Sequence, residues 1–198
     1  MRTLIGAVGY RFLRDHSAAF AVLDRLEQSD LGPDVTVEDV SYNPIALVQW
    51  LQGEAKDAFD QVVFVAAAGR EGRAAGEVDV YRWDRALPSD QLIQQAVTDA
   101  VTGIISLDNT IVVAGHFNAL PARVAIVDIK PREHEFGTAL SPEVAVAVET
   151  AIAVVRALAS DASAFDALPL AGLPDARHGV RPQFGIQIRK WGLTPGTR

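Results

Sequence analysis

The chain has 198 residues, 49% of them hydrophobic and 22% charged, which predicts one globular domain with a well-buried core. It contains no cysteine, so disulfides, thiolate metal sites and cysteine nucleophiles are excluded. The net charge of −7 argues against general nucleic-acid binding, and no apolar run has the length of a membrane span, so we expect a cytoplasmic protein.

The first seventeen residues predict the entry to an α/β domain. Thr3 to Val8 form a short apolar run, Gly9 breaks it, and an amphipathic segment over 17–27 follows. This order is typical of a buried strand, a loop at its C-terminal end and a covering helix. In such folds ligands bind at the C-terminal ends of parallel strands, so Asp15 and His16 are expected at the mouth of any site.

The alternation of apolar runs and amphipathic segments continues to about residue 158. We expect further strands near 35–40, 61–67, 77–83 and 123–129. The run at 61–67 is apolar on both faces, which is typical of a central parallel strand, whereas 77–83 alternates and suits an antiparallel edge. Helices are expected after the N-cap candidates Asn43, Ser89 or Asp90, and Ser141, the middle one interrupted near Gly103. Together these elements predict a three-layer α/β domain over residues 1–159.

The composition changes from residue 160. Prolines, glycines and basic residues replace the apolar periodicity, and residues 176–198 contain five basic residues and no acid, so the rest of the chain carries −12. We expect 160–198 to be an extension that packs less tightly than the body and is cut first by proteases, with one candidate strand at Phe184 to Ile188.

Three segments carry a resemblance to a known family. They are GAVGYRFLRDHS near the start, AAGEVDVYRW in the middle and VAIVDIKPREHEFGTALSPEV towards the end. In order and spacing they resemble the nickel–iron hydrogenase maturation endopeptidases, over residues 2–158. The resemblance implies a five-stranded, mostly parallel twisted sheet with helices on both faces. It also implies removal of a C-terminal extension from a hydrogenase large subunit once nickel is installed, with two acids and a histidine sensing the metal.

The metal-sensing positions of this family fall on unsuitable residues here. The acid after the first strand corresponds to His16, the aspartate of the third strand to Ala66, and the later histidine to Gly103, or near Asp108 if a gap is allowed. Alanine and glycine offer no side-chain ligand, and one imidazole cannot define a selective site. We therefore expect no metal and no cofactor, with nickel relevant only if the site has been rebuilt.

Several polar residues are expected at the strand ends. The candidate pocket comprises Arg11, Asp15, His16, Tyr42, Arg70 and Asp108. His16 is the foremost candidate, although a polar residue at a helix start, held by Asp15 or water, explains it equally well. An arginine-bearing rim would suit a carboxylate such as a peptide C-terminus, but each arginine alone is more simply a solvated loop charge.

The other histidines and the common catalytic motifs give no site. His116 is expected on a helix, His134 in a solvated loop and His178 in the basic extension. The sequence has no H-E-x-x-H, no G-x-S-x-G and no dinucleotide fingerprint, so a zinc protease, an α/β-hydrolase and a nucleotide-binding enzyme are unsupported.

Three functions remain open. The preferred one is a divergent, maturation-protease-like protein that has lost the nickel-sensing residues and acts as a binding or assembly factor, with a hydrogenase large subunit or a related protein as partner. The first alternative is an active endopeptidase with a site rebuilt from Asp15, His16 and Asp108. The second is a small-molecule or anion binder on the same scaffold. Whether the chain is an enzyme is left open, with a non-enzymatic role favoured.

Overall fold

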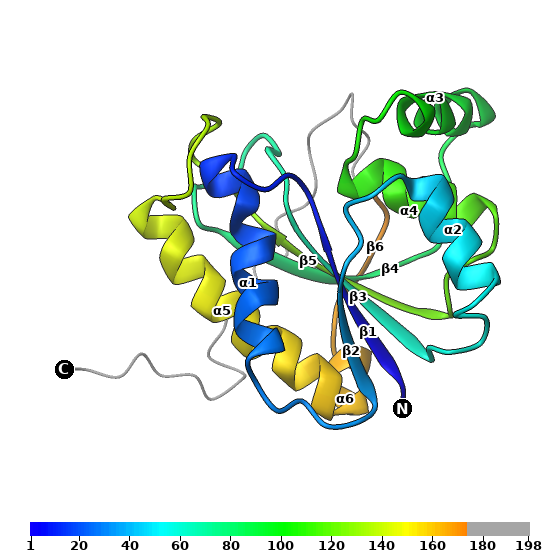
Figure 1. Ribbon diagram of the computed structural model, residues 1–198, viewed down its shortest axis with the longest axis horizontal. Helices are drawn as coiled ribbons and strands as arrows, with labels where there is room; N and C mark the ends of the chain where they lie inside the picture. Colours follow the sequence, from blue (N-terminus) through cyan, green and yellow to red (C-terminus); the bar gives the residue numbers. More distant parts are fainter. Residues whose placement is uncertain (174–198) are drawn as a thin grey trace.

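The computed structural model describes residues 1–173, which form a three-layer α/β fold around a six-stranded sheet (Figure 1). The strands lie in the order β2-β1-β3-β5-β4-β6. Their bounds are β1 Thr3–Val8, β2 Val35–Asp39, β3 Gln61–Ala67, β4 Val78–Trp83, β5 Arg123–Ile129 and β6 Leu170–Ala171. β1, β2, β3 and β5 are parallel to one another, and β4 is antiparallel to β5. The predicted α/β class, the five predicted strands and the antiparallel direction of 77–83 are confirmed. The expected edge position of 77–83 is wrong, because β6 pairs with the end of β4 and is itself the edge strand.

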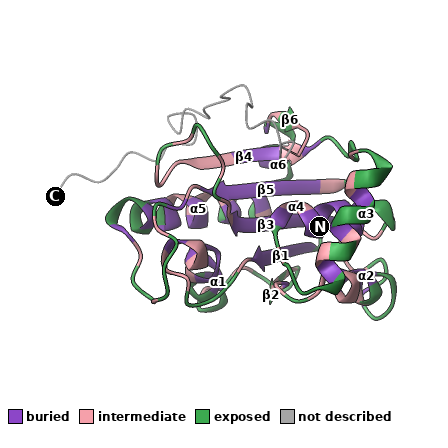
Figure 2. Ribbon diagram, turned by 90° about the horizontal axis from the view of Figure 1, so that it is seen from above, coloured by how far each residue is buried: buried purple, intermediate pink, exposed green. Residues whose placement is uncertain are grey.

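Helices cover both faces of the sheet (Figure 2). α1, α5 and α6 lie on one face, and α2, α3 and α4 on the other. Their bounds are η1 Arg14–Ser17, α1 Ala18–Glu27, α2 Pro44–Gln52, α3 Asp90–Val101, α4 Leu107–His116, α5 Pro142–Ser160 and α6 Ala162–Asp166. The predicted interruption of the middle helix is the turn between α3 and α4. No helix among residues 1–173 is long and apolar enough to cross a bilayer.

β3 shows why an unbroken apolar run becomes a central strand. Val63 and Val65 face the core under α1 and α5, whereas Val62, Phe64 and Ala66 face the core under α2 and α4. Both faces are therefore buried, and the strand has a parallel neighbour on each side. The prediction that 61–67 is central rather than at an edge is confirmed, because only a strand covered on both faces needs apolar side chains at every position.

The beginning of the predicted extension belongs to the fold. α5 runs to Ser160, and α6 then buries Ala164 and Phe165 in the same core as α1. β6 follows and pairs in parallel with the end of β4. Residues 160–171 thus contribute Ala164, Phe165 and Leu168 to the core, although more than half of them are exposed. A one-turn helix and a two-residue strand are too short to show a period in sequence, so neither was predicted. The candidate strand at Phe184 to Ile188 lies outside the described residues.

Candidate functional site

The loops after β1, β3 and β5 meet at the C-terminal edge of the parallel strands. The loops after β1 and β5 are joined by a backbone bridge between Leu13 and Gly137. The amide of Gly137 donates to the carbonyl of Phe12 at 2.9 Å, and the amide of Arg14 donates to the carbonyl of Gly137 at 3.0 Å. Phe12 and Arg14 have positive φ values of 65° and 42°. Non-glycine residues reach this region at a cost, so the bridged loops hold the rim in a defined shape.

Asp15 holds the same two loops together from inside. Its carboxylate is fully buried and accepts four hydrogen bonds, from the amides of Arg132, Glu133 and Ser141 and from the Ser141 hydroxyl, at 2.7–3.0 Å. Burial by itself raises the pKa of Asp15, but these hydrogen bonds outweigh it, so the pKa lies below its usual range. Ser141 is the N-cap residue of α5, as expected, but its side chain makes no capping hydrogen bond, because its hydroxyl donates to Asp15 instead. Because the Asp15 side chain is fully buried among these donors, it does not face the rim as a ligand-binding group.

His16 lies beside His134 rather than in contact with the other candidate residues. The two rings meet edge to face, with centroids 4.6 Å apart. Burial lowers the pKa of His16, and a charge on His134 lowers it further. His134 is exposed in a loop, as expected, but its pairing with His16 was missed. The available signal was topological, since both residues follow parallel strands and such strands end at the same edge.

Arg70 is the centre of a partly buried ion-pair network. Its guanidinium donates two hydrogen bonds to Asp108, at 2.8 and 3.0 Å, and its Nε donates to Asp128 at 2.6 Å. Arg73 also contacts Asp128, at 3.2 Å. Burial alone would lower the pKa of Arg70, but the hydrogen bonds to Asp108 and the charges of both acids raise it. The structure therefore brings two candidate residues, Arg70 and Asp108, into direct contact.

Asp128 was not among the candidate residues, although the sequence carried a signal. It is fully buried within a strand whose other positions after Arg123 are apolar. A carboxylate there must have a cation and hydrogen-bond donors, which Arg70, Arg73 and the amide of Ala68 provide. Burial raises the pKa of Asp128, and the two guanidinium groups oppose that rise. An acid inside an apolar strand run thus predicts a buried arginine partner.

Arg11 and Tyr42 belong to a different part of the rim, at the β2 edge. The guanidinium of Arg11 lies 3.4 Å from both Asp39 and Asp24 and stacks on the Phe20 ring at 4.3 Å. Tyr42 is partly buried, which raises its pKa. The described contacts of Arg11 are thus with carboxylates and an aromatic ring. The six candidate residues do not converge on one point.

A cavity of about 400 Å³ opens on the same rim. It is lined by Tyr10, Arg11, Leu13, His134, Glu135 and Phe136. Aromatic side chains around it are unusually exposed, with Phe136 at 91%, Phe12 at 65% and Tyr10 at 41%. We call Tyr10, Phe12 and Phe136 the aromatic rim. Exposed aromatic side chains gathered on a rigid surface are typical of protein-binding sites.

The residues present do not fit a nickel site. Ala66 is buried in β3 and lies beside Asp128 in the sheet register, and Gly103 forms the turn after α3 with φ of 83°. Neither offers a ligand. Residues 1–173 contain no group of three or more His, Asp or Glu side chains placed to hold a metal ion. The oxygens of Asp15 and Asp108 are already occupied by donors.

No family model and no curated protein matches the sequence. Solved structures do match. The hydrogenase 2 maturation peptidase of a Thaumarchaeota archaeon is 22% identical, over 81% of this chain and 99% of that one, with a TM-score of 0.57. The hydrogenase maturating endopeptidase HybD from E. coli is 19% identical over 78% and 90%, with a TM-score of 0.58. A further endopeptidase from Escherichia coli is 21% identical over 85% and 96%, with a TM-score of 0.61.

The match covers 90% or more of the length of each of these three structures. The resemblance predicted from the three sequence segments is therefore confirmed at the level of the fold. The chain has the fold of the nickel–iron hydrogenase maturation peptidases.

Proposed function

We propose that this chain is a non-proteolytic binding or assembly factor on the hydrogenase-maturation scaffold, and that it acts without a metal or cofactor of its own. Its partner is a hydrogenase large subunit or a related protein, and its location is cytoplasmic. The fold supports the class of partner, because solved structures with this fold are named hydrogenase maturation peptidases. The aromatic rim supplies a surface on which a protein partner could dock.

The proposal that the chain has no metal chemistry rests on one observation. The bidentate contact between Arg70 and Asp108 occupies both carboxylate oxygens of Asp108. A divalent ion bound to Asp108 would have to compete with this partly buried, charge-assisted pair and would place a second cation beside Arg70. A rebuilt protease site from Asp15, His16 and Asp108 is disfavoured for the same reason, since both acids already have donors. An anion site is disfavoured because Arg11 and Arg70 are neutralised by carboxylates.

Two experiments test the proposal. The first is calorimetric titration of the chain with Ni²⁺, for which we expect only weak binding that His16→Ala and Asp108→Ala leave unchanged. Tight one-to-one binding that either variant abolishes would instead support the rebuilt protease site.

The second experiment mixes the chain with a hydrogenase large subunit that retains its C-terminal extension. We expect a complex on gel filtration and no change in the subunit's mass. Phe136→Ser, in the aromatic rim, should weaken the complex. Val146→Ser, at an exposed apolar position on α5 outside the rim, should not. Cleavage of the extension would contradict the proposal, and so would equal binding by both variants.

A further inference from the structure

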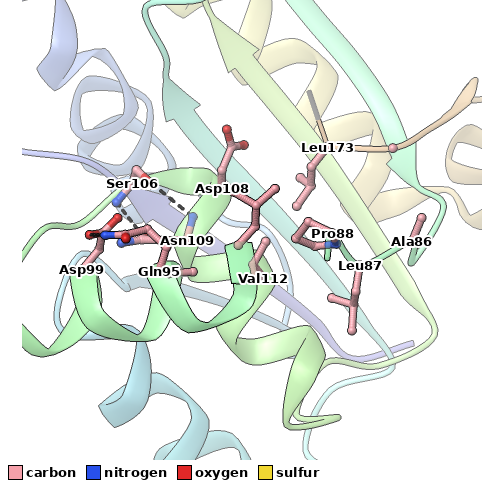
Figure 3. A pocket seen from close by; sticks show the side chains of 13 residues that line it. Ala86, Leu87, Pro88, Gln95, Asp99, Ser106, Asp108, Asn109, Val112 and Leu173 are labelled. Atoms are coloured by element: carbon pink, nitrogen blue, oxygen red, sulfur yellow. Dashed lines mark hydrogen bonds between the residues drawn. The ribbon is translucent and has the colours of Figure 1, made fainter. Parts of the chain in front are cut away.

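A groove separate from the aromatic rim lies on the α3–α4 face of the sheet. Its volume is about 340 Å³ (Figure 3). The walls come from the loop after β4, from α3, from α4 and from the segment after β6, and include Leu87, Pro88, Asp99, Val112 and Leu173. The lining is mainly apolar, and Leu87 remains 39% exposed. A hollow of this size with apolar walls can accept several side chains of a peptide segment.

The charges of the groove are of one sign. Asp99 and Asp108 line it, and no basic residue within 1–173 does. Asp108 is compensated by Arg70. Asp99 accepts a hydrogen bond from the Gln95 amide at 2.7 Å, and among residues 1–173 no cation forms an ion pair with it. The groove therefore suits an occupant that is both apolar and basic.

Such a segment begins at the wall of the groove itself. Leu173 lines the groove, and the sequence continues from it for 25 residues, 174–198. From residue 176 this stretch has five basic residues and no acid, and its centre reads Phe-Gly-Ile-Gln-Ile-Arg-Lys-Trp over 184–191. The remainder of the chain carries −12, so attraction between the two parts is expected.

We propose that the groove binds the chain's own C-terminal segment, within residues 174–198. The apolar side chains of the segment would fill the hollow, and its basic residues would face Asp99. Because the segment is tethered next to the groove, its effective concentration there is high without any partner. Asp108 contributes to both the groove and the Arg70 network, so the bound segment would lie beside the strand-end site. This inference does not depend on the proposed function.

Cross-linking of the full chain tests the proposal, because the absence of native cysteine makes any thiol cross-link unambiguous. One variant carries Ala86→Cys in the groove wall together with Gln187→Cys in the segment. The matched control carries Leu170→Cys with the same Gln187→Cys. Leu170 is 61% exposed in β6, three residues before Leu173, and it does not line the groove. Gln187 follows Leu173 by 14 residues, about 50 Å when extended, and both partner positions lie close to the start of this tether, so its length does not favour the groove.

After reaction with a short bismaleimide, we expect the groove variant to give at least about fivefold more intramolecular cross-link than the control. Asp99→Lys added to the groove variant should lower that yield about twofold or more, and high salt should act in the same direction. Equal yields at the two positions would overturn the proposal. Cross-links that join two chains, seen as dimers on a denaturing gel, would overturn it too, because they would assign the groove to a second copy.

Discussion

Replacing Asp15 by asparagine tests whether this carboxylate stabilises the fold by joining the loops after β1 and β5. One of its oxygens accepts a single hydrogen bond, from the Ser141 amide, and the other accepts three, from the amides of Arg132 and Glu133 and from the Ser141 hydroxyl. The single oxygen of an asparagine can face either the Ser141 amide or the group of three donors. If it faces the three donors, those three hydrogen bonds are kept but are no longer made to a charged group. The NH₂ group of the asparagine then faces the Ser141 N–H, so two donors oppose each other and that hydrogen bond is lost.

The loss can be estimated from these contacts. A hydrogen bond to a buried charged group contributes about 1.5–3 kcal/mol, and neutral bonds are about half as strong, so Asp15→Asn should lower the free energy of unfolding by roughly 3–5 kcal/mol. Urea unfolding at pH 7 measures this. The control is Asp24→Asn, an exposed partner of Arg11, which should cost at most about 1 kcal/mol. A loss of less than about 1 kcal/mol in the free energy of unfolding of Asp15→Asn would refute the claim that the Asp15 hydrogen bonds stabilise the fold.

The same carboxylate predicts a pH dependence. Its pKa is lowered in the folded state, because the hydrogen bonds outweigh burial. The stabilisation is therefore complete above the unfolded pKa of about 3.9 and is lost as the pH falls through the lower folded value. Stability of the native sequence should thus fall more steeply below about pH 4 than that of Asp15→Asn. Parallel acid-unfolding curves for the two proteins would contradict the assignment.

Three further perturbations follow from the structure. Arg70→Met leaves the buried Asp128 short of a cation and should cost roughly 3–5 kcal/mol in urea unfolding, whereas a loss near zero would mean that the network is dispensable. His16→Ala should change stability little at pH 7.5. Because burial and a neighbouring histidine lower the His16 pKa, the stability of the native sequence should fall as the pH drops below the unfolded value of about 6.5, and His16→Ala should remove that fall, which urea unfolding at a series of pH values measures. Gly76→Ala should destabilise more than Gly72→Ala. Both have φ near 77°, but only at Gly76 would a Cβ lie 2.5 Å from a backbone oxygen of α5; equal melting temperatures would contradict this.

The sequence predicted the elements whose patterns are long. The apolar run of β3 and the break between α3 and α4 at Gly103 are both in the structure as expected. β6 could not be predicted, because two residues have no period and its pairing with β4 depends on a chain reversal through α6.

The sequence predicted where Asp15 and His16 lie, but not which residues the candidate side chains contact. Asp15 and His16 do lie at the strand ends, yet the partners of Asp15 are 117 to 126 residues away in sequence. Arg70 and Asp108 were both candidates, but their pairing was not foreseen. Spacing along the chain cannot show that a guanidinium from one loop fills the space between two acids from other elements.

The position of β5 in the sheet has a consequence for folding while the chain is being synthesised. β5 lies between β3 and β4, although it follows both in sequence. While the ribosome is still adding the residues before Arg123, β3 therefore has one edge without its final partner. That edge belongs to one of the most apolar strands of the protein, and an unpaired apolar strand edge is a template for aggregation. Chains that stop before β5, through early termination or damage, should be the forms most in need of a chaperone.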